Sequence, residues 1–215
     1  MKLVVLVISV TAFASAAATF SREYSVAHFA RSSVLSAFEG LASGSGTPEI
    51  PMSSRSMREL FETCAAVQQG AIYTLQTSAT RADVDASCAR LARTTLERNP
   101  TFGAAHTILM LSSNSAPQIA ESLVLSQITA PLESWHAKLR LTKALSLYGT
   151  GYAALDRALG LDVGFMAQSG AGRAWLARLY RSQPDVRATL TALVGQSPNN
   201  VQSGFLNEVR RLDRD

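Results

Sequence analysis

Apolar residues recur at helical spacing along almost the whole chain. The stripe nearest the start consists of Val26, Ala30, Val34, Phe38 and Leu41. Side chains three, four or seven positions apart share one face of a helix, so each such stripe predicts an amphipathic helix with that face in a core. Similar stripes recur as far as Leu212, and after Phe20 no sustained alternation typical of strands is found. The pattern therefore predicts an all-α protein.

Residues rich in glycine and proline divide these stripes into segments. Two glycines and two prolines fall within residues 42–54, which favours an exposed connection over 42–55. We therefore predict an amphipathic helix over 21–41, a linker over 42–55 and a helical domain of antiparallel helix pairs over 56–215. Within that domain, Gly149-Thr150-Gly151 predicts a tight turn, and the glycine-rich stretch Gly160–Gly172 predicts a second flexible region.

The first twenty residues resemble an export signal in their order of charge and hydropathy. Lys2 precedes an uncharged run from Leu3 to Ala14, followed by the small-x-small pattern Ala14-Ser15-Ala16. This order predicts a signal peptide over 1–20 that a signal peptidase cuts near residues 16–18. The alternative is an uncleaved anchor, because residues 3–20 would form a helix of about 27 Å, which marginally spans a bilayer.

Both alternatives place the rest of the chain outside the cytoplasm. With Lys2 retained inside, the bulk of the protein is expected in the periplasm or another exported space. If the segment survives, membrane contact runs through residues 3–20 and the protein is held at the inner membrane.

The two cysteines lie on inward-facing stripes of neighbouring predicted helices. Cys64 belongs to the stripe from Met57 to Leu75, and Cys88 belongs to the stripe from Val84 to Leu96. A turn-like segment between the stripes folds the helices into a hairpin, and an exported compartment permits a disulfide across it. The alternative is two buried free thiols. Neither cysteine has the spacing or histidine neighbours of a metal site.

Composition and charge exclude several classes of function. Hydrophobic residues make up 47% of the chain and charged residues 17%, which is typical of a folded domain. The net charge of +4 is spread along the sequence without a basic run, so we expect no nucleic-acid partner. The three histidines, His28, His106 and His136, lack ligand spacing, and no cofactor or metal is predicted.

One segment is similar to the boundary between two tetratricopeptide repeats. There, Leu96-Glu97-Arg98-Asn99-Pro100 is followed by Phe102, Ala104, Ala105 and His106. A looser match places Trp135 and Gly151 at the aromatic and small positions of a further unit, although Lys138 and Val163 depart from the repeat pattern. The resemblance covers roughly residues 60–163 and implies a solenoid of stacked helix pairs with a partner-binding surface. An irregular helical bundle is the alternative.

A second resemblance concerns lytic transglycosylases, some of which are exported helical enzymes. Their Glu-Ser pair and downstream Gly-Leu-Met-Gln motif are similar to Glu133-Ser134 and to Gly164-Phe165-Met166-Ala167-Gln168 here, with Ala167 interrupting the second motif. The resemblance implies Glu133 as a general acid in a buried cleft. A simpler interpretation makes Glu133 a first-turn acid that favours the dipole of its helix.

These patterns together predict a non-catalytic exported adaptor or scaffold with a protein partner, in a cell-envelope or polysaccharide-export assembly. A glycan-cleaving enzyme and a structural membrane-anchored accessory are the alternative classes. No set of nucleophile, base and metal ligand converges in the sequence, so no catalytic residue is assigned. The partner's identity and the oligomeric state are not encoded in any motif.

Overall fold

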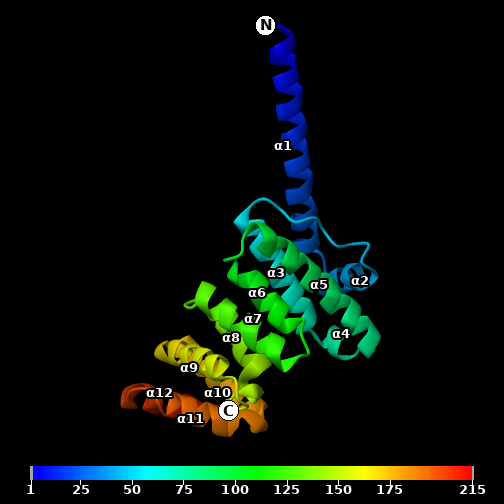
Figure 1. Ribbon diagram of the computed structural model, residues 1–215. Helices are drawn as coiled ribbons and strands as arrows, with labels where there is room; N and C mark the ends of the chain where they lie inside the picture. Colours follow the sequence, from blue (N-terminus) through cyan, green and yellow to red (C-terminus); the bar gives the residue numbers. More distant parts are fainter. Residues whose placement is uncertain (1, 215) are drawn as a thin grey trace. The chain divides into compact units, whose positions relative to one another are not determined.

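The protein is entirely helical over the residues that the structure describes. The computed structural model describes residues 2–214, with side chains from Val7 to Arg214. These residues form twelve α-helices and two short 3-10 helices, and they contain no strand (Figure 1). This confirms the predicted all-α class. The chain divides into two compact units, Met1–Pro100 and Thr101–Asp215.

The first unit contains five helices around one apolar core. They are α1 (Lys2–Arg31), α2 (Val34–Ser43), α3 (Ser54–Gln68), α4 (Ala71–Thr74) and α5 (Ser78–Arg98). Helix α3 packs against α1, α2 and α5, and α2 also packs against α5. Fully buried side chains in this core include Val26, Leu41, Leu60, Phe61 and Val84. The unit ends beside Asn99-Pro100, whereas the tetratricopeptide resemblance at that boundary stays a prediction.

The amphipathic helix expected over 21–41 is divided in the structure. Helix α1 continues without a break from the first apolar segment to Arg31, and α2 begins at Val34. Ser33 separates them because its side-chain oxygen accepts a hydrogen bond from the Ser36 amide at 3.1 Å. A serine at this position satisfies a free amide of the first helical turn, which favours a new helix start.

The segment between α2 and α3 is fastened to α1. The Glu23 carboxylate accepts hydrogen bonds from the amides of Met52 and Ser53, at 2.7 and 2.8 Å, and from the Ser53 hydroxyl at 2.9 Å. Partial burial opposes the charge on Glu23, but bonds from Ser56, Ser53 and Met52 lower its pKa. Because Ser53 is the N-cap of α3, Glu23 fixes where that helix begins.

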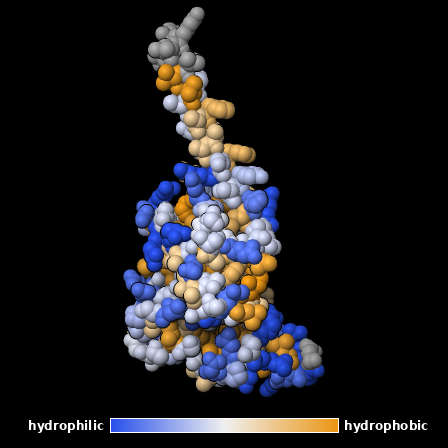
Figure 2. Space-filling model, turned by 90° about the vertical axis from the view of Figure 1, so that its right-hand side faces the viewer, coloured by the Kyte–Doolittle hydropathy of each residue, from blue (hydrophilic) through white to orange (hydrophobic). Residues whose placement is uncertain are grey.

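The first part of α1 exposes apolar side chains to solvent. All residues from Val7 to Phe20 are exposed, and buried contacts of α1 begin only at Val26. Figure 2 shows these apolar residues along the helix above its packed portion. In the part of the chain that the structure describes, no helix combines the length and hydropathy needed to cross a membrane.

The second unit contains the remaining seven α-helices. They are α6 (Gly103–Leu111), α7 (Ala116–Thr129), α8 (Ser134–Ala144), α9 (Ala153–Gln168), α10 (Gly170–Ser182), α11 (Arg187–Val194) and α12 (Asn199–Leu212). Short 3-10 helices, Leu145–Leu147 and Pro184–Val186, precede α9 and α11. Helix α9 packs against α7, α8, α10 and α11, so it is the central helix of this unit. The predicted tight turn at Gly149 and Gly151 is confirmed by their positive φ angles of 77° and 101°.

The flexible region predicted over Gly160–Gly172 is wrong. Helix α9 runs through most of this stretch and α10 begins at Gly170, with only Ser169 between them. The reason is tertiary: Leu159, Asp162 and Val163 are all fully buried, so the packed face overrides the weak helix propensity of the glycines. Gly172 is required at the turn because a Cβ there would collide with the Met166 carbonyl oxygen.

Candidate functional site

A buried polar cluster joins four helices of the second unit. Arg140 of α8 is fully buried, and its Nε and Nη2 donate to the two carboxylate oxygens of Asp162 on α9, at 2.6 and 2.7 Å. Its Nη1 also donates to the Ser126 hydroxyl of α7 at 3.0 Å. This two-bond geometry is the strongest arrangement available to an arginine and a carboxylate. Burial raises the pKa of Asp162, and the hydrogen bonds and charge of Arg140 oppose that rise.

The cluster continues to a hydroxyl, an imidazole and a carboxylate. Thr107 Oγ1 lies 2.6 Å from Ser126 Oγ and 2.7 Å from His136 Nδ1, and His136 Nε2 lies 3.5 Å from Glu133 Oε2. The order hydroxyl, imidazole, carboxylate is that of an activated nucleophile. However, Thr107 is fully buried, and its hydroxyl also donates to the Gly103 carbonyl. No substrate reaches that hydroxyl in this conformation, so the cluster stabilises the contacts among α6, α7, α8 and α9.

The residues of the transglycosylase resemblance do not form a buried acid site. Glu133 precedes α8, and its side chain is 46% exposed beside His136. Gln168 is exposed at the end of α9. A general acid on a glycan needs a buried environment, and the Glu133 side chain lies partly in solvent. Among the described residues, no three histidine, cysteine or acidic side chains are grouped to hold a metal ion.

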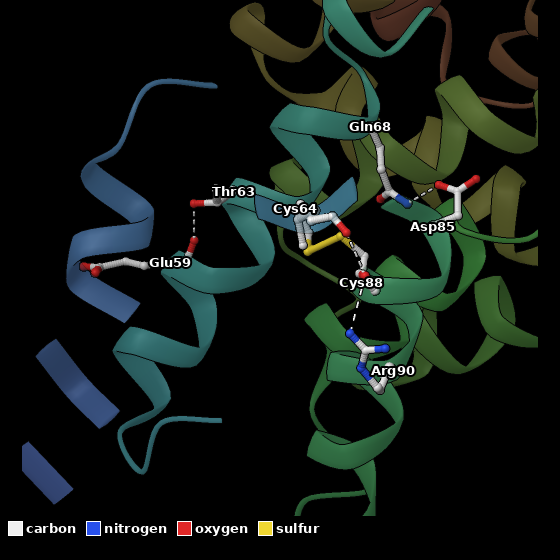
Figure 3. The surroundings of a disulfide bond; sticks show 9 residues. Glu59, Thr63, Cys64, Gln68, Asp85, Cys88 and Arg90 are labelled. Atoms are coloured by element: carbon white, nitrogen blue, oxygen red, sulfur yellow. Dashed lines mark hydrogen bonds between the residues drawn. A yellow bond between two sulfur atoms is a disulfide. The ribbon is translucent and has the colours of Figure 1, made fainter. Parts of the chain in front are cut away.

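Cys64 and Cys88 form a disulfide between α3 and α5, as the sequence predicts (Figure 3). Their Cα atoms are 6.0 Å apart, within the usual range for a disulfide, and both residues are fully buried. The turn-like segment predicted between the two stripes ends at Thr77, which is the N-cap of α5. The bridge is compatible with an oxidising compartment.

A second buried polar group lies near the disulfide. Gln68 Nε2 and the Tyr73 hydroxyl donate to the two carboxylate oxygens of Asp85, at 2.8 and 2.7 Å (Figure 3 shows the Gln68 bond). Burial and the neighbouring Asp85 carboxylate raise the pKa of Tyr73, so this phenol stays protonated and remains a donor. These hydrogen bonds hold the α4 segment against α5, and we assign them a structural role.

An apolar groove lies among the last three helices. It has a volume of about 210 Å³ and is lined by Tyr180, Thr191, Val194, Gly195, Gln202, Phe205, Leu206 and Val209. Phe205 is buried edge-on to the Tyr180 ring, with centroids 6.0 Å apart, and it is the one buried residue of α12. Leu206 beside it is 50% exposed. Helix α12 therefore presents apolar surface that the described chain leaves partly open.

One basic side chain lies beside this groove. The Arg187 guanidinium lies 5.4 Å from the Tyr180 ring centroid, and it donates to the carbonyl oxygens of Tyr180 and Arg181 at 2.8 and 3.1 Å. The acidic residues at this end of α12 are paired, Glu208 with Arg211 at 2.9 Å and Asp213 with Arg181 at 3.6 Å. The groove thus combines an apolar floor with the positive charge of Arg187 beside it.

The apolar residues of α12 are visible in the sequence as a helical stripe, but periodicity does not show that most of this stripe stays outside the core. The available signal is the stripe Phe205, Leu206, Val209 and Leu212 in a helix whose other positions are mostly polar. The chain matches no known protein family, no curated protein and no solved structure.

Proposed function

We propose that this protein is an exported, non-catalytic adaptor of a cell-envelope assembly that binds a protein partner through the groove of α10, α11 and α12. The observation that carries the proposal is the half-exposed Leu206 over a groove of about 210 Å³. A hollow of this size, lined by aromatic and aliphatic side chains, suits an apolar anchor residue of a partner.

The charge at the groove selects the chemistry of that partner. Arg187 lies beside the apolar floor, and both nearby acidic residues of the α12 segment are in ion pairs. An amphipathic helix with one bulky apolar side chain and an acidic neighbour complements this surface, because its apolar face fills the groove and its carboxylate meets Arg187. We propose such a helix as the occupant.

Export is supported by two independent features. Lys2 with the following apolar run and Ala14-Ser15-Ala16 is typical of a cleavable signal, and the Cys64–Cys88 disulfide is compatible with an oxidising space. The proposed compartment is the periplasm or an equivalent exterior space. The mass of the protein purified from its native source tests this: a mature chain that begins near residues 17–19 is expected, and an intact Met1 terminus would contradict cleavage.

Site-specific photo-crosslinking tests the adaptor proposal. A photoreactive amino acid replaces Leu206 in one variant and Leu161, an equally exposed leucine of α9 outside the groove, in the other. We expect a crosslink to one protein at position 206 and none at 161. With that partner purified, Leu206→Ser should weaken binding about tenfold and Leu161→Ser should not. Equal crosslinking at both positions, or a crosslink only to a second copy of this chain, would reject the proposal.

A further inference from the structure

A polar hollow in the first unit gathers three arginines from two helices. It has a volume of about 490 Å³, and its lining includes Arg22 of α1, Arg90, Thr94 and Arg98 of α5, and Thr47 and Glu49 of the connecting segment. Positions 90, 94 and 98 are each four residues apart, so they follow one face of α5. The hollow lies apart from the α10–α12 groove in sequence and shares no residue with it.

The charges in this hollow are only partly balanced. Arg22 Nε donates to Glu49 at 2.8 Å, which neutralises one arginine. Arg90 makes one long bond, 3.4 Å from its Nη2 to the Ser87 hydroxyl, and both Arg90 and Arg98 are exposed. Three arginines against one glutamate leave two positive charges at a single concavity. A concave surface with one sign of charge concentrates ions of the opposite sign.

We infer that this hollow binds a phosphate group. A phosphate monoester carries a charge of about −1.5 to −2 at neutral pH and offers three acceptor oxygens, which matches two unbalanced guanidinium groups and the Thr94 hydroxyl. Guanidinium groups donate paired hydrogen bonds to phosphate oxygens, and they keep their charge at every relevant pH. A single carboxylate carries one negative charge, so it would balance only one of the two arginines.

The position of the hollow offers two sources for that phosphate. Arg22 follows Phe20, the last residue of the exposed apolar part of α1, by two positions. A lipid headgroup would reach the hollow in a chain that retains this part of α1 and inserts it in a bilayer, whereas a soluble phosphate ester would reach it from solution in either form of the chain. Both present the same group to the same arginines, and the experiment distinguishes them.

Titration calorimetry on the full chain tests the site, with inorganic phosphate as the probe at constant ionic strength. We expect saturable binding of one phosphate that is about tenfold weaker in Arg90→Ala and in Arg98→Ala. Arg93→Ala is the matched control, because Arg93 is an exposed arginine of the same helix that does not line the hollow. Absence of saturable binding, equally tight binding of acetate, or an equal loss in Arg93→Ala would each overturn the inference.

Vesicle sedimentation identifies the source. Vesicles of phosphatidylcholine alone and vesicles that also contain phosphatidylglycerol are compared with the same three variants. A lipid headgroup is supported if more protein sediments with vesicles that contain phosphatidylglycerol, and if Arg90→Ala and Arg98→Ala lose this increase while Arg93→Ala keeps it. Phosphate binding without such a gain supports a soluble ester. Failure of the Leu206 experiment would leave this site unaffected, because the two surfaces have no residue in common.

Discussion

Arg140 and Asp162 form an ion pair inside the core, and neither side chain reaches solvent. Ion pairs of this kind are expensive to bury and more expensive to break. The carboxylate and the guanidinium satisfy each other, and Ser126 takes a further donor of the arginine. This complete pairing explains how an aspartate occupies the central helix of the second unit.

Replacing only the arginine should therefore be severe. We expect Arg140→Met to lower the free energy of unfolding by about 3 to 5 kcal/mol, because Asp162 is left buried without its cation. In this variant burial raises the folded-state pKa of Asp162 above its unfolded value. The contribution of that carboxyl to the free energy of unfolding is then fully present at low pH, and it is lost as the pH rises through the folded-state pKa.

Urea denaturation of the variant between pH 4 and 7 measures this dependence. The loss should be larger at pH 7 than at pH 4, and Arg140→Met with Asp162→Leu should recover much of it. A double variant as unstable as the single one would show that the pair contributes through packing and not through charge.

Glu23 has the opposite pH dependence. Hydrogen bonds from Ser56, Ser53 and Met52, opposed by partial burial, hold its pKa below the ordinary value of 4.5. Its contribution is therefore present above the unfolded pKa and lost as the pH falls through the lower folded value. We expect Glu23→Gln to cost about 1 kcal/mol at pH 7 and progressively less below pH 4.5, measured by denaturation at each pH. A constant cost across that range would exclude the charge as its cause.

At the scale of elements, two glycines of the α9–α10 segment have different roles. A Cβ at Gly172 collides with the Met166 carbonyl oxygen, whereas a Cβ at Gly164 in the middle of α9 meets nothing within 4 Å. We expect Gly172→Ala to destabilise the protein by about 2 kcal/mol or more, because backbone must move. Gly164→Ala should stabilise it by about 0.5 to 1 kcal/mol through helix propensity. Thermal unfolding of both variants tests the pair, and a stabilising Gly172→Ala would contradict this account.

The existence of most helices could be predicted from their stripes, but the sequence could not predict where some of them end. The division at Ser33 depends on a side-chain bond to the Ser36 amide, which periodicity does not encode. The helix through Gly160 and Gly164 depends on Asp162 of α9, which pairs with Arg140 of α8. Such contacts depend on the folded structure, whereas the local propensity of glycine favours a break in the helix.

The candidate surfaces were less predictable than the fold. The disulfide followed from two inward stripes and was predicted. The α10–α12 groove required knowing that only Phe205 of α12 is buried, and the arginine hollow required bringing Arg22 beside Arg90. Both depend on how helices meet, because residues far apart in sequence line each surface.

At the scale of the whole molecule, the disulfide lies within the first of two units. Replacing both cysteines with alanine should lower the free energy of unfolding by about 3 kcal/mol, because the bridge closes a loop with a sequence separation of 24. Hydrogen exchange should accelerate in α3 and α5 of the first unit, and α8 and α9 should keep their protection. Equal acceleration in all four helices would show that the two units unfold together.

The uninterrupted α1 has a consequence for how the protein would leave the cytoplasm. Its buried contacts begin at Val26, well after the proposed cut near residues 16–18, so the precursor can make every non-covalent contact that the mature chain uses. Nothing in the leader would then delay folding, and a folded precursor cannot thread a narrow translocation channel. The missing restraint is the Cys64–Cys88 bridge, because a reducing cytoplasm keeps both cysteines as free thiols. Under the proposed export, oxidation on the far side adds the stability that the precursor lacks, and it makes the passage effectively one-way.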